Sequence, residues 1–310
     1  MKPLQIGNHI FNWGSRTYVM GILNVTPDSF SGDGILALPK EHRDDVSGLA
    51  LSRRVGEVEA AVEQATDFLA NGADILDVGG ESTRPGSQPV NANEEAERVI
   101  PVIEAIGKEF PDALISIDTY KAEVSEAAFQ AGAHILNDVW GLRADPELAN
   151  IAAKYKVPVI LMHNRSNPAS VEVRAQLGNA YIGSTYENLM EDVKRELLAS
   201  VELAIKAGVE ETRIVLDPGI GFGKAREHNL ELINRLDEIR ALGYPVLLGP
   251  SRKSFIGFTL DLPADQRVEG TAATVAVGIT RGADIIRVHD VKEMARVAKM
   301  TDAIVRTPSR

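Results

Sequence analysis

Short β-branched and apolar runs alternate along this chain with longer segments of helical periodicity. Such runs predict strands, and their alternation with helices is typical of βα units, in which helices cover a parallel sheet. Eight strand-like runs occur, namely Tyr18–Leu23, Ile75–Val78, Leu114–Asp118, Ile135–Asp138, Val157–Met162, Ile214–Asp217, Pro245–Leu248 and Ile285–His289. Helical patterns lie between them at residues 55–70, 93–109, 121–131, 186–207, 228–242 and 268–281, and a last one begins at Val291.

The number and spacing of these units favour a closed barrel over an open sheet. Eight units of about 40 residues or fewer fill the chain as one domain. Three helix-to-strand junctions repeat a glycine, at residues 71–74, 131–133 and 281–284, and glycine suits the left-handed position that ends a helix. A Rossmann fold is the competing arrangement, but no G-x-G-x-x-G pattern follows the first strand. We therefore predict an α/β fold, a (β/α)8 TIM barrel over residues 1–310.

Three segments do not fit the repeat. Residues 1–17 predict an N-terminal β-hairpin with its turn at Gly7-Asn8, placed to plug the amino-terminal end of the barrel. Long connections follow the first strand, at residues 27–54, and the fifth, at residues 164–185. Connections of this length are commonly lids or insertions, so we expect 27–54 to be a long mobile loop. Its charged part, residues 35–54, is either a solvated excursion or an element that controls substrate access.

Composition excludes several classes of function. The net charge of −11 argues against a general nucleic-acid binder, because phosphate backbones require clustered Lys and Arg. The chain has no cysteine, which excludes disulfides, thiolate nucleophiles and thiolate metal sites. No apolar stretch reaches the roughly 18 residues of a membrane span, and the N-terminus has no signal-peptide pattern. We therefore expect a cytoplasmic protein that binds neither nucleic acid nor membrane.

Polar residues recur where the predicted strands end. They are Asn24, Asp77, Asp118, Asn137 with Asp138, His163, Asp217, Ser251 to Lys253, and Arg287 with His289. Any one of them could simply cap the following helix, but in a barrel the carboxyl ends of all strands converge on one mouth. Asp118, Asn137 and Asp217 suit a flat heterocycle with ring N–H and amino groups. Asn24, Arg287, His289 and nearby helix N-termini suit a diphosphate, so the predicted ligand has a polar ring at one end and phosphate at the other.

The glycine-rich run 217–224 is not a nucleotide P-loop. That motif requires glycine at 218 and Ser or Thr at 225, where this chain has Pro218 and Ala225. The run instead lets the backbone approach a ligand closely and places Phe222 beside it. A purely structural glycine turn is the alternative.

Five blocks of the sequence together resemble the dihydropteroate synthases. They are residues 20–31 (MGILNVTPDSFS), 77–86 (DVGGESTRPG), 217–224 (DPGIGFGK), 251–257 (SRKSFIG) and 287–290 (RVHD). The resemblance runs in order over nearly the whole chain. It implies a transferase of folate biosynthesis that condenses 6-hydroxymethyl-7,8-dihydropterin diphosphate with 4-aminobenzoate. The products are 7,8-dihydropteroate and diphosphate, formed by a dissociative substitution, and the family is the target of sulfonamides.

The resemblance also implies roles for individual residues. Catalysis would involve Asp118, Lys253, Arg287 and His289. The pterin ring would be bound by Asp118, Asn137, Met162, Asp217, Gly221 and Lys253, and the diphosphate by Asn24, Arg287 and His289. Asn24 would also bind the Mg²⁺ cofactor. The 4-aminobenzoate pocket would be formed by Phe30, Thr83, Arg84, Pro85, Phe222 and Ser254, and the protein would be a homodimer.

Two other functions fit the fold but fit the residues less well. A pterin-dependent methyltransferase domain needs no diphosphate cluster, whereas Arg287 and His289 are present. A non-catalytic pterin-binding paralogue should lack one or more of Asn24, Lys253, Arg287 and His289, and all four are present. One departure from the family pattern is Arg165, two residues after His163, which either adds a cation near the mouth or faces solvent.

Overall fold

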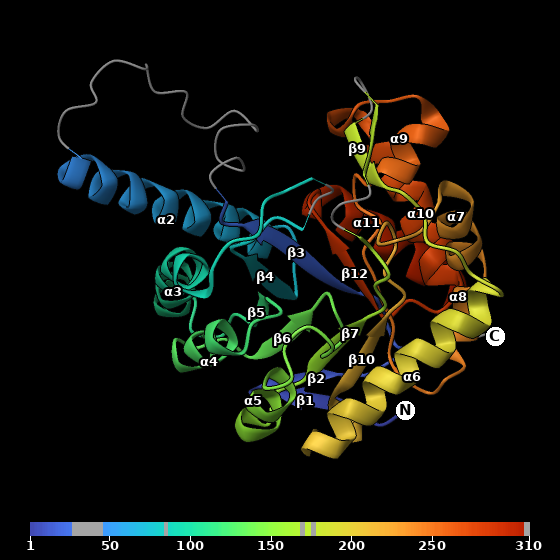
Figure 1. Ribbon diagram of the computed structural model, residues 1–310, viewed down its shortest axis with the longest axis horizontal. Helices are drawn as coiled ribbons and strands as arrows, with labels where there is room; N and C mark the ends of the chain where they lie inside the picture. Colours follow the sequence, from blue (N-terminus) through green and yellow to red (C-terminus); the bar gives the residue numbers. More distant parts are fainter. Residues whose placement is uncertain (27–45, 84–85, 168–170, 175–177, 307–310) are drawn as a thin grey trace.

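The computed structural model describes residues 1–26, 46–83, 86–167, 171–174 and 178–306. Its centre is a barrel of eight parallel strands surrounded by helices (Figure 1). The strands are β3 (Tyr18–Asn24), β4 (Ile75–Gly79), β5 (Ile115–Asp118), β6 (Ile135–Asp138), β7 (Val159–Met162), β10 (Ile214–Asp217), β11 (Leu247–Leu248) and β12 (Ile285–Val288). Their order is β10-β7-β6-β5-β4-β3-β12-β11, and a parallel bridge between Leu216 and Val246 joins the two outer strands. The predicted barrel and its eight strands are confirmed.

Helices cover the outside of the barrel. They are α2 (Val46–Ala70), α3 (Ala92–Glu109), α4 (Ala122–Gln130), α5 (Leu148–Tyr155), α6 (Leu189–Ala207), α7 (Arg226–Asn234), α8 (Leu236–Arg240), α9 (Ser254–Leu260), α10 (Val268–Thr280) and α11 (Val291–Val305). Two short 3-10 helices, η1 (Glu211–Arg213) and η2 (Ala264–Gln266), complete the set in the described ranges. Among these helices, none has both the length and the apolar character that a membrane crossing requires.

The glycine junctions have the predicted geometry. Gly72, Gly132 and Gly282 have φ of +97°, +112° and +99°, which is the left-handed region where a Cβ is strained. Two of the junctions continue with an aspartate that fixes a neighbouring strand. Asp74 accepts a hydrogen bond from the Val19 N–H at 2.8 Å, and Asp284 accepts one from the Val246 N–H at 3.0 Å. Each of these two junctions therefore ends a helix and sets the start of a neighbouring strand.

The amino-terminal hairpin closes one end of the barrel, as predicted. β1 (Leu4–Ile6) and β2 (His9–Phe11) pair in antiparallel register around Gly7 and Asn8. Leu4, Ile6 and Phe11 pack on the inward side chains at the beginning of the barrel strands, and the Phe11 and Tyr18 rings lie 4.6 Å apart. Those side chains are Tyr18, Met20, Ile75, Leu114, Ile135, Ile160, Val215, Leu247 and Ile285.

Three boundaries differ from the prediction. The first helix after β3 begins at Val46 rather than at residue 55, because residues 46–54 contain no proline and several good helix formers. The connection after β7 contains an antiparallel hairpin, β8 (Val171–Arg174) and β9 (Gly178–Tyr181), and β9 lies beside α9 (Figure 1). The predicted helix 228–242 is two helices, α7 and α8. Of the long first connection, residues 27–45 lie outside the described residues.

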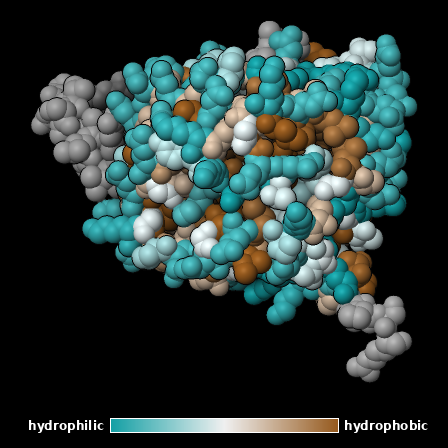
Figure 2. Space-filling model, turned by 90° about the horizontal axis from the view of Figure 1, so that it is seen from below, coloured by the Kyte–Doolittle hydropathy of each residue, from teal (hydrophilic) through white to brown (hydrophobic). Residues whose placement is uncertain are grey.

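On the face shown in Figure 2, hydrophilic side chains dominate and hydrophobic ones gather between them. Exposed apolar side chains on the last two helices include Val277 on α10, and Met300 and Ile304 on α11. Met300 and Ile304 are four residues apart, so they lie on one face of α11.

Candidate active site

The inward side chains of the barrel form two layers. In the lower layer they are apolar, and two residues further along each of several strands the inward residue is polar. Asp77 follows Ile75, Asn137 follows Ile135, Asp217 follows Val215 and Arg287 follows Ile285. Side chains alternate between the two faces of a strand, so residues two apart share a face and the second lies nearer the carboxyl end. The polar strand-end residues at these positions therefore meet at one mouth, as predicted.

Arg287 lies at the centre of the polar layer. Its Nε donates to Asp77 Oδ2 and its Nη2 donates to Asp118 Oδ2, both at 2.5 Å. Asn137 Nδ2 donates to the same Asp77 oxygen at 3.1 Å. Arg287, predicted to hold an anion, thus contacts Asp118, predicted to hold a ring. Asp77, which had no predicted ligand of its own, connects Arg287 with Asn137.

The charges in this cluster do not cancel. Asp77 is fully buried, and the side chain of Asp118 is 13% exposed. One guanidinium serves both carboxylates, and burial disfavours ionisation, so the pKa of Asp118 is raised to about 7. The neighbouring Asp77 charge raises it further, while Arg287 opposes the shift. The same two carboxylates raise the pKa of Arg287 and keep it protonated. Asp118 therefore changes charge near neutral pH.

In strand order, Lys253 and Asp217 lie on the far side of Arg287 from Asp77, after β11 and at the end of β10. Asp217 Oδ1 accepts from the Gly219 N–H at 2.7 Å, and burial raises the pKa of Asp217. Lys253 Nζ donates to the Ile220 carbonyl and lies 4.7 Å from the centre of the Phe222 ring. Burial lowers the pKa of Lys253 to about 8. The Arg287 charge lowers this pKa as well, whereas the Asp217 carboxylate and the aromatic face favour the ammonium form, so burial outweighs the favourable contacts.

The glycine-rich run owes its conformation to close backbone approaches. A Cβ on Gly219 would lie 1.8 Å from the His163 carbonyl oxygen, and Gly219 has φ of +70°. A Cβ on Gly221, with φ of +85°, would lie 3.0 Å from Lys253 Cδ. Any side chain at Gly219 would collide with backbone, and one at Gly221 would press on Lys253. The run folds back on the end of β7 and presents Phe222 beside Lys253.

A buried lysine supports this loop. Lys224 Nζ donates to the carbonyls of Gly219 at 2.9 Å and Phe222 at 3.0 Å, and it lies 2.9 Å from His163 Nδ1. The other ring nitrogen of His163 lies 3.0 Å from Glu196. Burial and the Lys224 charge lower the pKa of His163 to about 4. His163 was expected to line the mouth, but it is 2% exposed and belongs to the support of the loop.

Two other expectations about single residues are settled by their contacts. Asp138 does not face the mouth, because its carboxylate accepts from the Trp140 N–H at 2.8 Å and the Leu142 N–H at 2.5 Å. It follows Asn137 directly and therefore points to the other face of the strand. Arg165 is neither a cation at the mouth nor a free solvent-facing group, since it forms an ion pair with Glu196 and donates to the Thr185 carbonyl at 2.7 Å.

The loop after β11 is fixed by side chains from neighbouring elements. Arg252, at φ of +55°, forms a two-bond ion pair with Asp290, at 3.0 and 2.5 Å. Ser251 Oγ lies 3.0 Å from His289 Nδ1 and accepts from the His289 N–H at 3.1 Å. His289 is thereby oriented beside the end of β12. Ser254 is the first residue of α9, as expected for a residue at a helix N-terminus.

Three of the remaining predicted residues lie at or after the ends of barrel strands. Asn24 ends β3 opposite Gly79, and Met162 ends β7. Thr83 is half-buried after β4, in a segment that begins at Glu81. Glu81 pairs with Lys121, which also pairs with the buried Glu95, so the start of this segment is anchored on the beginning of α4. Phe30, Arg84 and Pro85 lie outside the described residues.

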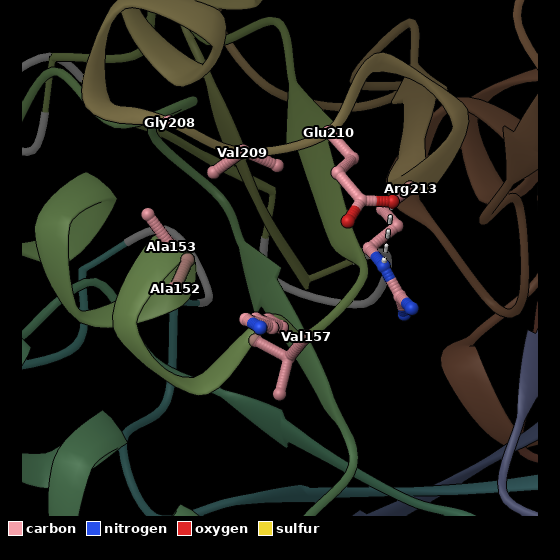
Figure 3. Close-up of a pocket in the computed structure, with 8 residues that line it drawn as sticks. Ala152, Ala153, Val157, Gly208, Val209, Glu210 and Arg213 are labelled. Atoms are coloured by element: carbon pink, nitrogen blue, oxygen red, sulfur yellow. Dashed lines mark ion pairs between the residues drawn. The ribbon is translucent and has the colours of Figure 1, made fainter.

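Two hollows lie away from the mouth. One, of about 80 Å³, is lined by Ala152, Ala153, Lys156, Val157, Gly208, Val209, Glu210 and Arg213 (Figure 3). Its only charged contact among the residues drawn is the ion pair of Arg213 and Glu210, at 3.5 Å. A second, of about 300 Å³, lies beside the hairpin turn at Gly7. Neither includes a predicted site residue, whereas the mouth brings several of them into contact, so the mouth is the candidate active site.

The family model of the pterin-binding enzymes matches residues 20–289. The chain is similar to the dihydropteroate synthase of Clostridium beijerinckii, with 49% identity over 98% of this chain and 100% of the relative. The dihydropteroate synthase of Bacillus subtilis is 47% identical over 95% of this chain and 90% of its own length.

Solved structures of dihydropteroate synthases share the fold. One from Clostridium difficile, in the presence of pteroic acid, has a TM-score of 0.81 and 46% identity over 96% of this chain and all of that chain. One from Xanthomonas albilineans with 4-aminobenzoic acid has a TM-score of 0.82 and 37% identity, covering 99% of both chains. One from Yersinia pestis with a sulfonamide drug complex has a TM-score of 0.82 and 37% identity over 99% of this chain and all of that chain.

Proposed function

Because this chain belongs to the dihydropteroate synthase family of pterin-binding enzymes and has that family's transferase activity in folate synthesis, we propose that its mouth joins 6-hydroxymethyl-7,8-dihydropterin diphosphate to 4-aminobenzoate. The observation that carries the proposal is the contact of Arg287 with Asp118. It places a guanidinium suited to a diphosphate against a carboxylate suited to a pterin ring. One substrate that carries both groups can therefore engage both residues at once.

The ring would be held by the polar layer. Asp118 and Asp217 offer carboxylate acceptors to ring N–H and amino groups, and Asn137 adds an amide. Lys253 donates to ring acceptors, and Met162 and the backbone at Gly221 pack against the ring. When the ring engages Asp118, Arg287 loses that partner and turns its Nη groups toward the diphosphate. Substrate binding would thus replace an internal ion pair with two charge-assisted contacts.

The reaction would proceed by departure of the diphosphate from the pterin methylene carbon. The carbon–oxygen bond breaks, its electron pair leaves with the diphosphate, and the cation that remains is stabilised by the Asp118 carboxylate. Arg287 and His289 stabilise the leaving anion, and Ser251 holds His289 in position. The nitrogen lone pair of 4-aminobenzoate then forms the new carbon–nitrogen bond, and the nitrogen loses one proton. No protein nucleophile is needed.

We propose Mg²⁺ as the cofactor, held in part by Asn24. Asn24 offers a hard amide oxygen at the end of β3. In the described ranges no group of three or more His, Asp or Glu side chains is arranged to hold a metal ion. Mg²⁺ often has few protein ligands and completes its octahedron with water and substrate phosphate oxygens. Bound by Asn24 and the diphosphate, the ion would neutralise charge on the leaving group.

The second substrate would bind at the rim. Phe222 and Ser254 lie next to Lys253, and Thr83 lies after β4. Together with Phe30, Arg84 and Pro85 they are proposed to form the 4-aminobenzoate pocket. Because the Yersinia pestis relative was solved with a sulfonamide drug complex, we propose that sulfonamides compete for the same pocket here.

A homodimer is also part of the proposal. Val277, Met300 and Ile304 are 44%, 62% and 67% exposed on the adjacent helices α10 and α11. An apolar stripe of this kind is suited to a second copy of the chain. Sedimentation should show a dimer that M300E with I304K converts to monomer; a monomeric wild type would contradict the proposal. The cytoplasmic location expected from the sequence stays a prediction.

The activity is tested with purified protein, pterin diphosphate, 4-aminobenzoate and Mg²⁺. We expect stoichiometric diphosphate and dihydropteroate, loss of both on chelation of Mg²⁺ with recovery on its return, and inhibition by a sulfonamide that 4-aminobenzoate relieves. Absence of both products under these conditions would overturn the proposed reaction.

A further inference from the structure

Asp77 makes contacts that link the two halves of the proposed substrate site. Its Oδ2 accepts from Arg287 Nε at 2.5 Å and from Asn137 Nδ2 at 3.1 Å, and the residue is fully buried. We propose that Asp77 is a positioning residue, which sets the orientation of Arg287 toward the diphosphate and of Asn137 toward the pterin ring. The inference rests on the proposed function.

The contact with Arg287 fixes the plane of the guanidinium. Nε is the nitrogen nearest the main chain, so a bond there leaves both Nη groups available to a ligand. The second carboxylate on Arg287 is that of Asp118, which the ring would engage. Once it does, Asp77 is the carboxylate that still holds the guanidinium. Without it, the long side chain would lose more conformational freedom on binding, which weakens binding.

The contact with Asn137 sets which end of the amide faces the ligand. An ionised carboxylate can only accept hydrogen bonds, so the Asn137 NH₂ group must be the end that faces Asp77. The amide oxygen is then the atom left to face the mouth. Asp77 therefore makes Asn137 an acceptor for a ring N–H or amino group rather than a donor. An acceptor at this position selects an orientation of the heterocycle in which a hydrogen-bond donor on its edge faces Asn137.

The cost of Asp77 to the fold supports a functional role. Its other oxygen, Oδ1, is buried and has no hydrogen-bond partner among the described residues. A buried carboxylate with an unsatisfied oxygen is destabilising compared with an apolar residue of similar size. The Asp77 charge also contributes to the raised pKa of the neighbouring Asp118. The unsatisfied oxygen therefore carries a desolvation cost that an apolar residue would not have, whereas the orientation of Arg287 and Asn137 depends on the carboxylate.

The test compares Asp77→Ala and Asp77→Asn with Ser116→Ala. Ser116 is the register partner of Asp77 on β5, is equally buried, and its hydroxyl has no partner among the described residues, so it is a matched control. We expect D77A to lower kcat/KM for pterin diphosphate about 100-fold, mostly through KM, with the KM for 4-aminobenzoate within about twofold of wild type. D77N keeps one acceptor oxygen and should restore about a tenth of wild-type kcat/KM. S116A should stay within about twofold of wild type.

A double-mutant cycle measures whether Asp77 acts through Arg287. Binding of pterin diphosphate is measured by calorimetry for wild type, D77N, Arg287→Gln and the double variant. We expect D77N to weaken binding several-fold less in the R287Q background. Additive effects, or a D77N variant with the wild-type KM for pterin diphosphate, would overturn the inference. If wild type itself forms no dihydropteroate, the proposed function fails; if wild type is active and the Asp77 variants match S116A, only the role of Asp77 fails.

Discussion

The two inward layers of the barrel come from the same strands and do opposite things. Ile75, Ile135 and Ile285 belong to the lower layer, with the side chains of the amino-terminal hairpin. Asp77, Asn137 and Arg287 lie two residues further on, about 7 Å along each strand, and hold one another at the mouth. One strand period therefore separates the part of the interior that stabilises the fold from the part that binds substrate.

The two layers also differ in what burial does to them. In the lower layer, burial removes apolar surface from water and is favourable. In the upper layer it leaves Asp77 Oδ1 without a partner and shifts the pKa values of Asp118 and Lys253 toward neutrality. Such strain is expected where a ligand completes the set of interactions. Substitutions in the upper layer should therefore change activity, and those in the lower layer should change stability.

The largest effect is expected for Asp118→Asn. Loss of the carboxylate removes stabilisation of the pterin cation, so kcat should fall about 1,000-fold, or about 4 kcal/mol in the transition state. The free energy of unfolding should change by about 1 kcal/mol or less, because asparagine keeps the shape and Arg287 keeps Asp77. Single-turnover kinetics and urea titration measure the two quantities. Wild-type turnover in this variant would remove Asp118 from the chemistry.

In the lower layer, Ile160→Ala should lower stability and leave activity nearly unchanged. Ile160 is 1% exposed and lies two residues before Met162 on β7. The cavity left behind should cost about 3 kcal/mol of unfolding free energy. At a temperature where the variant is fully folded, kcat/KM should stay within about twofold of wild type, because the polar layer above keeps its contacts. A large fall in kcat/KM with little loss of stability would break the separation of the layers.

The pH dependence of kcat/KM for pterin diphosphate should report the upper layer. Asp118 must be ionised to hold the ring, so activity should rise as pH passes its pKa of about 7. Lys253 must be protonated, so activity should fall as pH passes its pKa of about 8. The charges of Arg287, Asp77, Glu95 and Asp138 act on Asp118, and that of Asp77 raises its pKa. Asp77→Asn should therefore move the acid limb to lower pH. The substrate ionises in the same way with both enzymes, so its ionisations do not contribute to the difference between their profiles. If the acid limb stayed at the same pH, it would not report the ionisation of Asp118.

The sequence allowed the barrel, the hairpin and the convergence of strand ends to be predicted, because these follow from periodicity and glycine positions. The sequence did not reveal which of these side chains contact one another. Asp77 and Arg287 are 210 residues apart, and Lys224 and His163 are 61 apart, so no local pattern connects them. It also did not reveal which way His163 points, since a strand-end polar residue can face the mouth or a supporting loop. Asp45, a residue type favoured at helix N-caps, precedes the helix start at Val46, but the charged run in which it stands is equally typical of a solvated loop.

The smallest effect on activity is expected for Asp138→Asn. This variant tests whether two adjacent residues of β6 that point to opposite faces of the strand have different roles. Asp138 follows Asn137 directly, but its carboxylate bonds to the backbone of the loop after β6 instead of the mouth. Turnover should stay within about twofold of wild type, whereas Asn137→Ala should raise the KM for pterin diphosphate about tenfold.

Stability gives Asp138→Asn a second signature. Burial raises the pKa of Asp138 to about 6, above its ordinary value, so the ionised form destabilises the wild type above about pH 6. That penalty is relieved as pH falls toward 4, and asparagine does not titrate. Wild type should therefore gain stability relative to Asp138→Asn between pH 6 and 4, measured by urea unfolding at each pH. If Asp138→Asn lost turnover as Asn137→Ala does, the face of the strand would not decide the role of a residue, and the separation of binding from stability would fail at this strand.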